Sequence, residues 1–509
     1  MSDLPNGWIE TTLNQIAFPD RPRELPKDNP DLPFVGMENV EAHSMKLLGT
    51  VPAAQLKSSA VHFQPGDVLY GRLRPYLNKV LRAQIEGLCS AEFIVFSHRD
   101  EINSAWLAYL LNSSEFVRFA SHLNTGDRPR VDFDQIGDYE LLLAPRSEQD
   151  RIVAEIEKQL TRLDAATTAL KRVQANLKHY RASVLKAACE GRLVPTEAEL
   201  ARKDGRDYEP ADQLLQRILR ERRTRWEADT LAKMIASGKP PKDDRWKQKY
   251  KEPLPPDPDF NFTIPEGWWI ASMDQLTSHI TSGSRDWSAF YGRGTGTFVM
   301  AQNVRPGRFD LSVKQAVDPP KDDASVYRCR IAMADLLVTI VGANTGDVCR
   351  IGEQLDEFYV CQSVALMRPV LTNLSTYLDT YMNSTEHGQL VYKRYTYGAG
   401  RPHLGFDHLK ATPVLLPPED EAARIAEHVT EILSRLEHVE ASVEAQSLRI
   451  PVLRKSILSR AFSGELVPHN HSDEPASALL ERIRVERTKA MTGQVRGGPR
   501  RTPELVEVG

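Results

Sequence analysis

Two stretches of the chain carry apolar residues at alternating steps of four and three. Counted this way from Ile425 to Ile457, nine of ten positions are apolar, and the same count 273 residues earlier, from Ile152 to Val184, again gives nine of ten. A heptad pattern of this length is typical of helices that pack along one another in a coiled coil. The outer faces are charged and alanine-rich, so we expect each apolar seam to pack against the other.

The ends of these two helices are marked by capping residues. Ser147 with Glu148 opens the first, Pro417-Pro418 with Glu419 opens the second, and Gly191 and Gly464 follow their last turns. We therefore predict long antiparallel helices over residues 147–191 and 419–465, with a kink at Pro451.

The chain also repeats itself. Ser183 to Pro195 (SVLKAACEGRLVP) and Ser456 to Pro468 (SILSRAFSGELVP) share seven identities in thirteen positions, where about one is expected from composition. Further matched pairs lie upstream of these two segments: LPNGW (4–8) with IPEGW (264–268), FVGMENV (34–40) with FVMAQNV (298–304), GDVL (66–69) with ADLL (334–337), and NSSE (112–115) with NSTE (383–386). We interpret the chain as an internal duplication with a pseudo-two-fold relation between the copies.

The first part of each copy mixes short β-type runs, punctuated by Gly and Pro, with helical patterns at 105–121 and 375–392. The expected strands are 68–70, 93–96 and 140–143 in the first copy, and 336–341 and 364–367 in the second. This pattern predicts an α+β fold in which two globular domains, residues 1–146 and 264–418, are separated by the coiled coil.

The segment between the copies, residues 192–263, holds a basic helical pattern at 214–226 and then a Lys- and Pro-rich stretch that predicts a semi-rigid linker. From Arg217 to Lys251 there are twelve basic and five acidic residues, which fits either a solvated face or a strip that contacts phosphates or a partner. A fainter copy of the basic helix begins at Pro475, inside a tail (466–509) that we expect to be partly disordered.

Composition excludes several classes of protein. Over 509 residues the chain has 65 basic and 69 acidic side chains, so it does not coat nucleic acid by bulk positive charge. No apolar run is long enough for a membrane span and no leader is recognised, so we expect a cytoplasmic protein. Its five cysteines lie far apart, which predicts reduced thiols and neither a disulfide framework nor a metal site.

We find no catalytic constellation. The Asp318-Pro319-Pro320 string lacks the following aromatic residue of an adenine methyltransferase, and Gly292 to Gly296 does not join a strand to a helix. A nucleotide-binding P-loop and a nucleophile elbow are also absent, and His469-Asn470-His471 lies in the tail without a metal-site context.

Candidate DNA-reading residues are polar and basic side chains on Gly- and Pro-bearing turns, because Arg reads guanine and Asn or Gln reads adenine in the major groove. A solvated loop charge is the simpler interpretation of any single arginine among them. In the first copy we select Arg72, Arg74, Tyr76, Asn78, Lys79, Arg128 and Arg130. In the second copy we select Ser284, Arg285, Trp287, Tyr291, Arg293, Gln302, Asn303, Asn344, Arg401 and His403. Trp8 and Trp268, in contrast, are expected to be core residues.

With the paired P-x-G-W segments, the two unlike α+β segments, the long helices and their GRLVP and GELVP exits, the chain resembles a type I restriction-modification specificity subunit from Leu4 to Pro468. The resemblance implies that residues 1–146 and 264–418 are target recognition domains, each reading half of a bipartite, asymmetric site in double-stranded DNA. It also implies that the helices, about 48 Å from Ile152 to Val184 at ~1.5 Å per residue, set the distance between the halves.

The resemblance further implies that this chain has no catalysis and no cofactor of its own. Two methyltransferase subunits would bring S-adenosylmethionine and methylate adenine, and restriction subunits would bring ATP and Mg. Two other classes stay open: a scaffold whose tandem domains bind proteins without sequence-specific DNA binding, and an enzyme with an unrecognised site.

Overall fold

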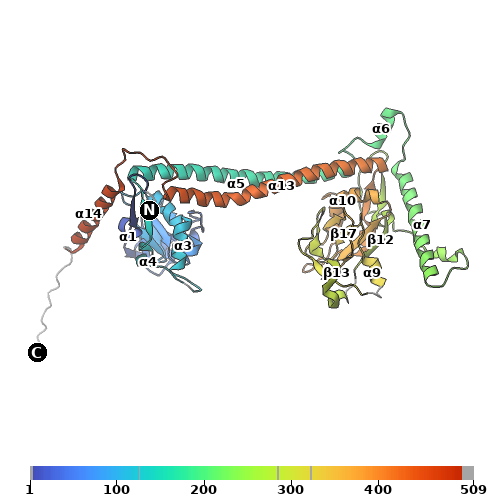
Figure 1. The fold of residues 1–509 in the computed structure, drawn as a ribbon, viewed down its shortest axis with the longest axis horizontal. Coiled ribbons are helices and arrows are strands. Elements are labelled where there is room, and N and C mark those ends of the chain that lie inside the picture. The colour runs from blue at the N-terminus through green and yellow to red at the C-terminus, as the bar shows by residue number, and fades with distance from the viewer. Residues whose placement is uncertain (1–3, 125, 284–285, 321–323, 496–509) are drawn as a thin grey trace, which may run out of the picture. The chain divides into compact units, whose positions relative to one another are not determined.

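The computed structural model describes residues 4–124, 126–283, 286–320 and 324–495. The chain forms two compact units, one of residues 1–171 with 444–509 and the other of residues 172–443. Each unit therefore combines one globular segment with the beginning of one long helix and the end of the other (Figure 1). The predicted α+β class is confirmed.

The described strands of unit 1 form three sheets. Five strands are ordered β2-β5-β8-β3-β4, three are ordered β7-β6-β9, and β1 pairs antiparallel with β10. Their bounds are β1 Ile9–Thr12, β2 Arg23–Glu24, β3 Pro33–Val35, β4 Val51–Pro52, β5 Ala60–Phe63, β6 Val68–Gly71, β7 Val80–Arg82, β8 Gly87–Cys89, β9 Phe93–Phe96 and β10 Glu140–Leu143. The helices are α1 Leu13–Ile16, α2 Ser104–Asn112, α3 Ser114–His122, α4 Phe133–Gly137, α5 Arg146–Cys189, which continues into unit 2, and α14 Ala476–Val495.

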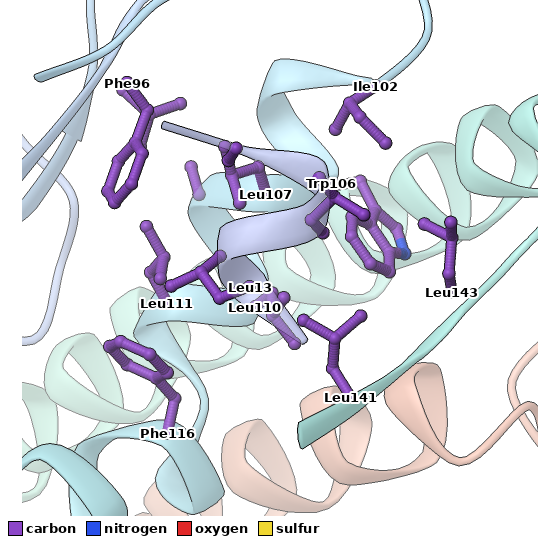
Figure 2. Packing of buried hydrophobic residues seen from close by; sticks show 14 of the residues in the cluster. Leu13, Phe96, Ile102, Trp106, Leu107, Leu110, Leu111, Phe116, Leu141 and Leu143 are labelled. Atoms are coloured by element: carbon purple, nitrogen blue, oxygen red, sulfur yellow. The ribbon is translucent and has the colours of Figure 1, made fainter. Parts of the chain in front are cut away.

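The core of unit 1 lies where α2 packs between the sheets and the long helices. Figure 2 shows Trp106 among the buried side chains of α2, with Leu143 of β10 beside it. The Trp106 ring also meets Phe462 of the second long helix edge to face, at 5.5 Å between centroids. The globular segment and the helices thus share one core, because burying the apolar face of α2 also covers the helix seam.

Unit 2 is built in the same manner, with sheets ordered β12-β20-β17-β18 and β16-β13-β19 and the pairs β11-β21 and β14-β15. Its strands are β11 Trp269–Ser272, β12 Thr277–Ser282, β13 Tyr291–Val299, β14 Val304–Arg305, β15 Arg308–Phe309, β16 Gln315–Val317, β17 Leu336–Thr339, β18 Val348–Arg350, β19 Phe358–Val360, β20 Val364–Pro369 and β21 Pro413–Leu416. Its helices are α6 Glu197–Asp204, α7 Ala211–Ala236, α8 Met273–Leu276, α9 Ala324–Cys329, α10 Ser375–Asn383, α11 Gly388–Tyr395, α12 Phe406–Ala411 and the start of α13 Glu419–Phe462.

The two long helices, α5 and α13, have the predicted extent, and α13 is continuous through Pro451. They pack together within each unit, since Ile152 and Ile457 share the core of unit 1, and Val184 and Ile425 share that of unit 2. Charged pairs flank the seam: Arg454 lies 2.6 Å from Asp164, and Arg181 lies 3.2 Å from Glu440. The seam is less buried than predicted, because a two-helix coil covers only one side of each residue. Its exposed large apolar members are Val173, Tyr180, Val439 and Leu453.

The P-x-G-W segments anchor the start of each long helix. The Trp8 indole donates to the buried Glu148 carboxylate at 3.1 Å, and Trp268 donates to buried Glu421 at 2.9 Å. These carboxylates lie in the first turns of α5 and α13, where negative charge is also favoured by the helix dipole. The two tryptophans are buried, as predicted from the sequence.

Another matched pair of segments also has a structural explanation. Gly66 and Ala334 both adopt positive φ, and each precedes a buried aspartate that opens a strand. Asp67 accepts two hydrogen bonds from Arg21, and Asp335 accepts two from Arg368. A buried carboxylate needs such a partner, because an unpaired charge in the core is costly.

The two predicted globular helices are each broken. Ser113 caps α3 by accepting from the Phe116 amide at 3.2 Å, so 105–121 forms α2 and α3 instead of one helix. The second pattern breaks in the same matched segment, where the Ser384 hydroxyl lies 3.0 Å from His387 Nδ1 between α10 and α11. A serine that bonds to nearby groups competes with the helical ladder, which explains both breaks.

The Lys- and Pro-rich stretch, predicted as a semi-rigid linker, is held to unit 2 by several contacts. Trp246 is buried, the Leu254 amide donates to Asp274, and the Asp257 amide donates to the Ala411 carbonyl, both at 2.9 Å. The stretch therefore packs along unit 2.

The basic helix and its fainter copy occupy corresponding places in the two units. The Ala211 amide at the start of α7 donates to Gly267, and the Ala476 amide at the start of α14 donates to Gly7, each at 2.9 Å. α14 extends to Val495, so the tail is helical over much of its length. Among the described residues, no helix is long and apolar enough to cross a membrane.

Candidate nucleic-acid interface

In unit 1, the structure brings together the two arginine-bearing turns selected from the sequence. Leu73 forms an isolated bridge with Arg130, and the Arg74 amide donates to the Pro129 carbonyl at 2.7 Å. The Val131 amide donates to the Arg72 backbone carbonyl at 3.0 Å. Two loops more than fifty residues apart therefore form one surface.

Unit 2 contains the same arrangement. Val341 forms a bridge with His403, and the Gly342 amide donates to the Pro402 carbonyl at 3.0 Å. The rings of Tyr397 and His403 stack at 5.7 Å between centroids. The loops that carry Asn344, Arg401 and His403 thus correspond to those that carry Arg72, Arg74 and Arg130.

A third loop joins each pair, and the sequence selection missed it. The Arg72 amide donates to the Glu92 carbonyl, and the Ile340 amide donates to the Ser363 carbonyl, both at 2.8 Å. Glu92 and the Gln362-Ser363 pair therefore lie beside the selected turns. No local composition marks these residues, because only β-strand pairing brings them to the surface.

A fourth element is a one-turn 3₁₀ helix in the matched FVGMENV and FVMAQNV segments: η2 (Met37–Asn39) and η7 (Ala301–Asn303). Asn39 Oδ1 accepts from the Gly36 amide at 2.8 Å, and Asn303 Oδ1 accepts from Met300 at 2.9 Å. These bonds fix each turn and leave the residue before the asparagine exposed, Glu38 in one unit and Gln302 in the other. Alignment of the two segments could have identified Glu38, since Gln302 was selected.

Two of the four selected arginines of unit 1 are already ion-paired. Arg72 pairs with Asp132, and Arg130 pairs with Glu92. Burial, and then repulsion from Arg130, lowers the pKa of Arg72. Arg128 and Tyr76 are exposed, and the described chain gives no ion pair to Arg128, so these two side chains are the most available to a ligand.

Two of the remaining candidates of unit 2, Tyr291 and Gln302, lie at one hollow. Tyr291, Met300 and Gln302 line it together with Gln362 and Ser363. Tyr291 and Arg293 lie on strand β13, not on a loop as their glycine-rich surroundings predicted. The exposed Arg293 side chain donates through its guanidinium to the Ala289 carbonyl.

Three selected residues are corrected by their burial. Trp287 is 1% exposed and stacks on Phe298, and Asn303 is 2% exposed with its amide donating to the Asp310 and Val313 carbonyls. Asn78 is 5% exposed and donates to the Asn112 carbonyl at 3.1 Å. Their polar or aromatic character serves the fold, so they cannot reach a base edge.

Three further selected residues are Lys79, Ser284 and Arg285. Lys79 is half-buried and donates to the Met37 carbonyl, so its charge holds η2 in place. Ser284 and Arg285 lie outside the described residues.

The described residues of the site show neither a metal centre nor an exposed thiol. No cluster of three potential metal ligands occurs in the described part of the chain. All five cysteines are buried, and burial raises the pKa of Cys89, Cys189, Cys349 and Cys361. A thiol held in its neutral form is a poor nucleophile.

Comparison with known proteins gave the following relatives. The chain is 21% identical over 515 residues to the Escherichia coli K12 type I restriction enzyme EcoKI specificity subunit, covering 95% of this chain and 96% of that protein. It is 24% identical over 197 residues to the E. coli EcoDI specificity subunit, a match that spans 38% of this chain and 44% of the relative. No protein-family model matches.

Solved structures show the same fold. The crystal structure of the HsdS subunit from Thermoanaerobacter tengcongensis matches 91% of this chain and 98% of that chain, with a TM-score of 0.57 and 18% identity. A chain from a structural study of complex assembly in a type I R-M system matches 92% of this chain and all of that chain, with a TM-score of 0.64 and 17% identity. The relatives bear out the resemblance found in the sequence: over most of its length the chain is similar to a type I restriction enzyme specificity subunit, and the second relative has the same description.

Proposed function

We propose that this protein is the sequence-specific DNA-recognition subunit of a type I restriction-modification complex. Each unit reads one half of a bipartite, asymmetric site through its four loops. The observation that carries the proposal is that both units present these loops on the same backbone framework but with different exposed side chains.

The chemistry of the exposed positions supports unequal half-sites. Glu38 on η2 and Gln302 on η7 occupy corresponding positions. In the major groove a carboxylate accepts from cytosine, whereas a Gln amide can bond adenine with both of its atoms. A shared framework with such substitutions would read two different sequences.

The reaction itself is assigned to partners. Two methyltransferase subunits would bind S-adenosylmethionine and methylate adenine, and restriction subunits would use ATP and Mg. The long helices would hold the two units at a fixed interval, because each has residues in both units. Deleting seven residues in register from both helices should then shorten the unspecific gap of the target without changing either half-site.

Mapping of modified adenines tests the central proposal. The chain should co-purify with a methyltransferase, and the mapped motif should be split, with a fixed gap. Replacing residues 1–146 by the corresponding segment of a relative should change one half of the motif and leave the other unchanged.

A continuous motif, or a motif that survives this exchange, would contradict the proposal. A purified chain with no sequence preference for DNA, but with bound protein partners, would instead support the alternative of an interaction scaffold.

A further inference from the structure

A segment of unit 2 outside the recognition loops concentrates positive charge. We call residues 217–251 the basic arm; it comprises most of α7, a turn at Gly238 and the 3₁₀ helix η5 (Asp244–Lys249). The arm has twelve basic and five acidic residues, a net charge of +7 in a chain whose total is −4. In Figure 1, the end of α7 and the returning segment extend beyond the sheets of unit 2.

The arm has a defined structure. Trp226 of α7 stacks on buried Trp246 at 6.0 Å and meets Tyr250 edge to face at 5.3 Å. Arg222 donates to the Tyr250 hydroxyl at 2.7 Å and to the Thr277 carbonyl at 2.9 Å. These contacts hold the returning segment against α7 and fasten both to the recognition domain.

About half of the arm's cations have no counter-charge. Arg217, Arg222, Arg223, Arg225, Arg245 and Lys247 each lie within 4.0 Å of a carboxylate. The other six are exposed, and the structure gives them no ion pair within the described chain: Arg220, Lys233, Lys239, Lys242, Lys249 and Lys251. Lys249 and Lys251 flank Tyr250, so the aromatic cluster fixes the backbone that carries them.

The recognition domain of the same unit lacks this charge. Residues 264–418 contain fourteen basic and fifteen acidic side chains. Polyelectrolyte attraction to duplex DNA grows with the number of phosphates that cations neutralise. The arm is therefore the part of unit 2 best suited to supply attraction that does not depend on sequence.

We propose that the basic arm binds the phosphate backbone of duplex DNA beside the half-site read by unit 2, adding affinity but no base selectivity. An acidic protein surface is less favoured, because the arm exposes little apolar area for a protein interface: its exposed large apolar side chains are Leu231 and Ile235. The inference rests on the proposed DNA-binding function.

Salt dependence of DNA binding tests the arm. The arm variant carries Lys239→Gln, Lys242→Gln, Lys249→Gln and Lys251→Gln in the full-length chain. The control carries Lys27→Gln, Lys57→Gln, Lys171→Gln and Lys178→Gln, four exposed lysines outside the arm with the same total charge change. Binding is measured from 50 to 300 mM salt to one duplex that contains the mapped motif and one that lacks it.

Each lost phosphate contact should lower the slope of log affinity against log salt by about 0.9. The arm variant should therefore lose between about 1 and 3.6 in slope on both duplexes, with their affinity ratio unchanged. The control should lose less than half as much.

An arm variant with the parental slope, or a control with the same loss, would overturn the inference. A slope that falls only on the duplex with the motif would also overturn it. So would an arm variant that keeps the slope of the unaltered chain but no longer co-purifies with a partner protein. If the unaltered chain itself shows no preference between the duplexes, the proposed function fails, but the slope comparison still decides the arm.

Discussion

Replacing Gly191 by alanine tests how the P-x-G-W segments are held against the ends of the long helices. Gly191 follows α5 with φ of +66°, and a Cβ there would lie 3.1 Å from Pro265 and 3.4 Å from Trp268. Gly205 follows α6 in the same unit with φ of +64°, and a Cβ there would have nothing within 4 Å. The two glycines therefore share a backbone conformation and differ in their surroundings.

The expected magnitudes follow from that difference. An alanine in the left-handed region costs roughly 1–2 kcal/mol, and both variants carry this cost. Gly191→Ala must also displace the Pro265 ring by a few tenths of an ångström, at the low end of the 1–3 kcal/mol typical of overpacking. The effect on the unfolded chain is the same for both and cancels. We therefore expect Gly191→Ala to destabilise unit 2 by about 1 kcal/mol more than Gly205→Ala.

Differential scanning calorimetry of the full chain measures this difference. For a unit of this size, 1 kcal/mol corresponds to about 2–4 °C in Tm. The counterpart in unit 1, Gly464→Ala, should lower the stability of its unit by more, because its Cβ would lie 2.6 Å from Cγ of Pro5. An equal fall in Tm for Gly191→Ala and Gly205→Ala would refute the packing of the P-x-G-W segment against the turn that follows α5.

Two further predictions concern the recognition loop η7 and the buried carboxylate of α13. Gln302→Ala should reduce base discrimination at one position of the mapped motif by ~1–3 kcal/mol without changing Tm. Asn303→Ala should lower Tm, because the Asn303 side-chain amide donates to two backbone carbonyls. A loss of Tm in Gln302→Ala, or a loss of discrimination without a change of Tm in Asn303→Ala, would contradict the site. Burial raises the pKa of Glu421 to about 7, against hydrogen bonds from Glu197 and Trp268 that lower it. The folded state thus keeps a proton that the unfolded chain has lost between about pH 4.5 and 7, and stability from this group falls by roughly 3 kcal/mol as pH rises through that window. Glu421→Gln should flatten the pH profile of Tm over that range, and an unchanged profile would show that the carboxylate is ionised throughout.

The four loops show how far a candidate site can be predicted from sequence. Turn composition selected Arg72, Arg130 and Asn344, and the structure brings their loops together within each unit. Composition could not separate exposed Gln302 from buried Asn303, because both are amides in one segment and only hydrogen bonding to Met300, Asp310 and Val313 distinguishes them.

The broken helices show a similar limit. The apolar pattern of 105–121 continues across Ser113, and only the cap formed with Phe116 ends one helix and begins the next. The positive charge of the basic arm can be counted in the sequence. The contact between Trp226 and Trp246 cannot be predicted from the hydrophobic pattern, because a turn separates the two residues.

The sequence by itself determined the features that depend on local pattern: two long amphipathic helices, the matched segments, the burial of Trp8 and Trp268, and the exclusion of known catalytic motifs. Periodicity and repetition are properties of the linear chain, so they can be read without coordinates. The tertiary structure alone decided which polar residues are exposed, which arginines are ion-paired, and which distant loops share a surface. These depend on strand pairing between segments far apart in the chain, and a single sequence does not encode that pairing in any local feature.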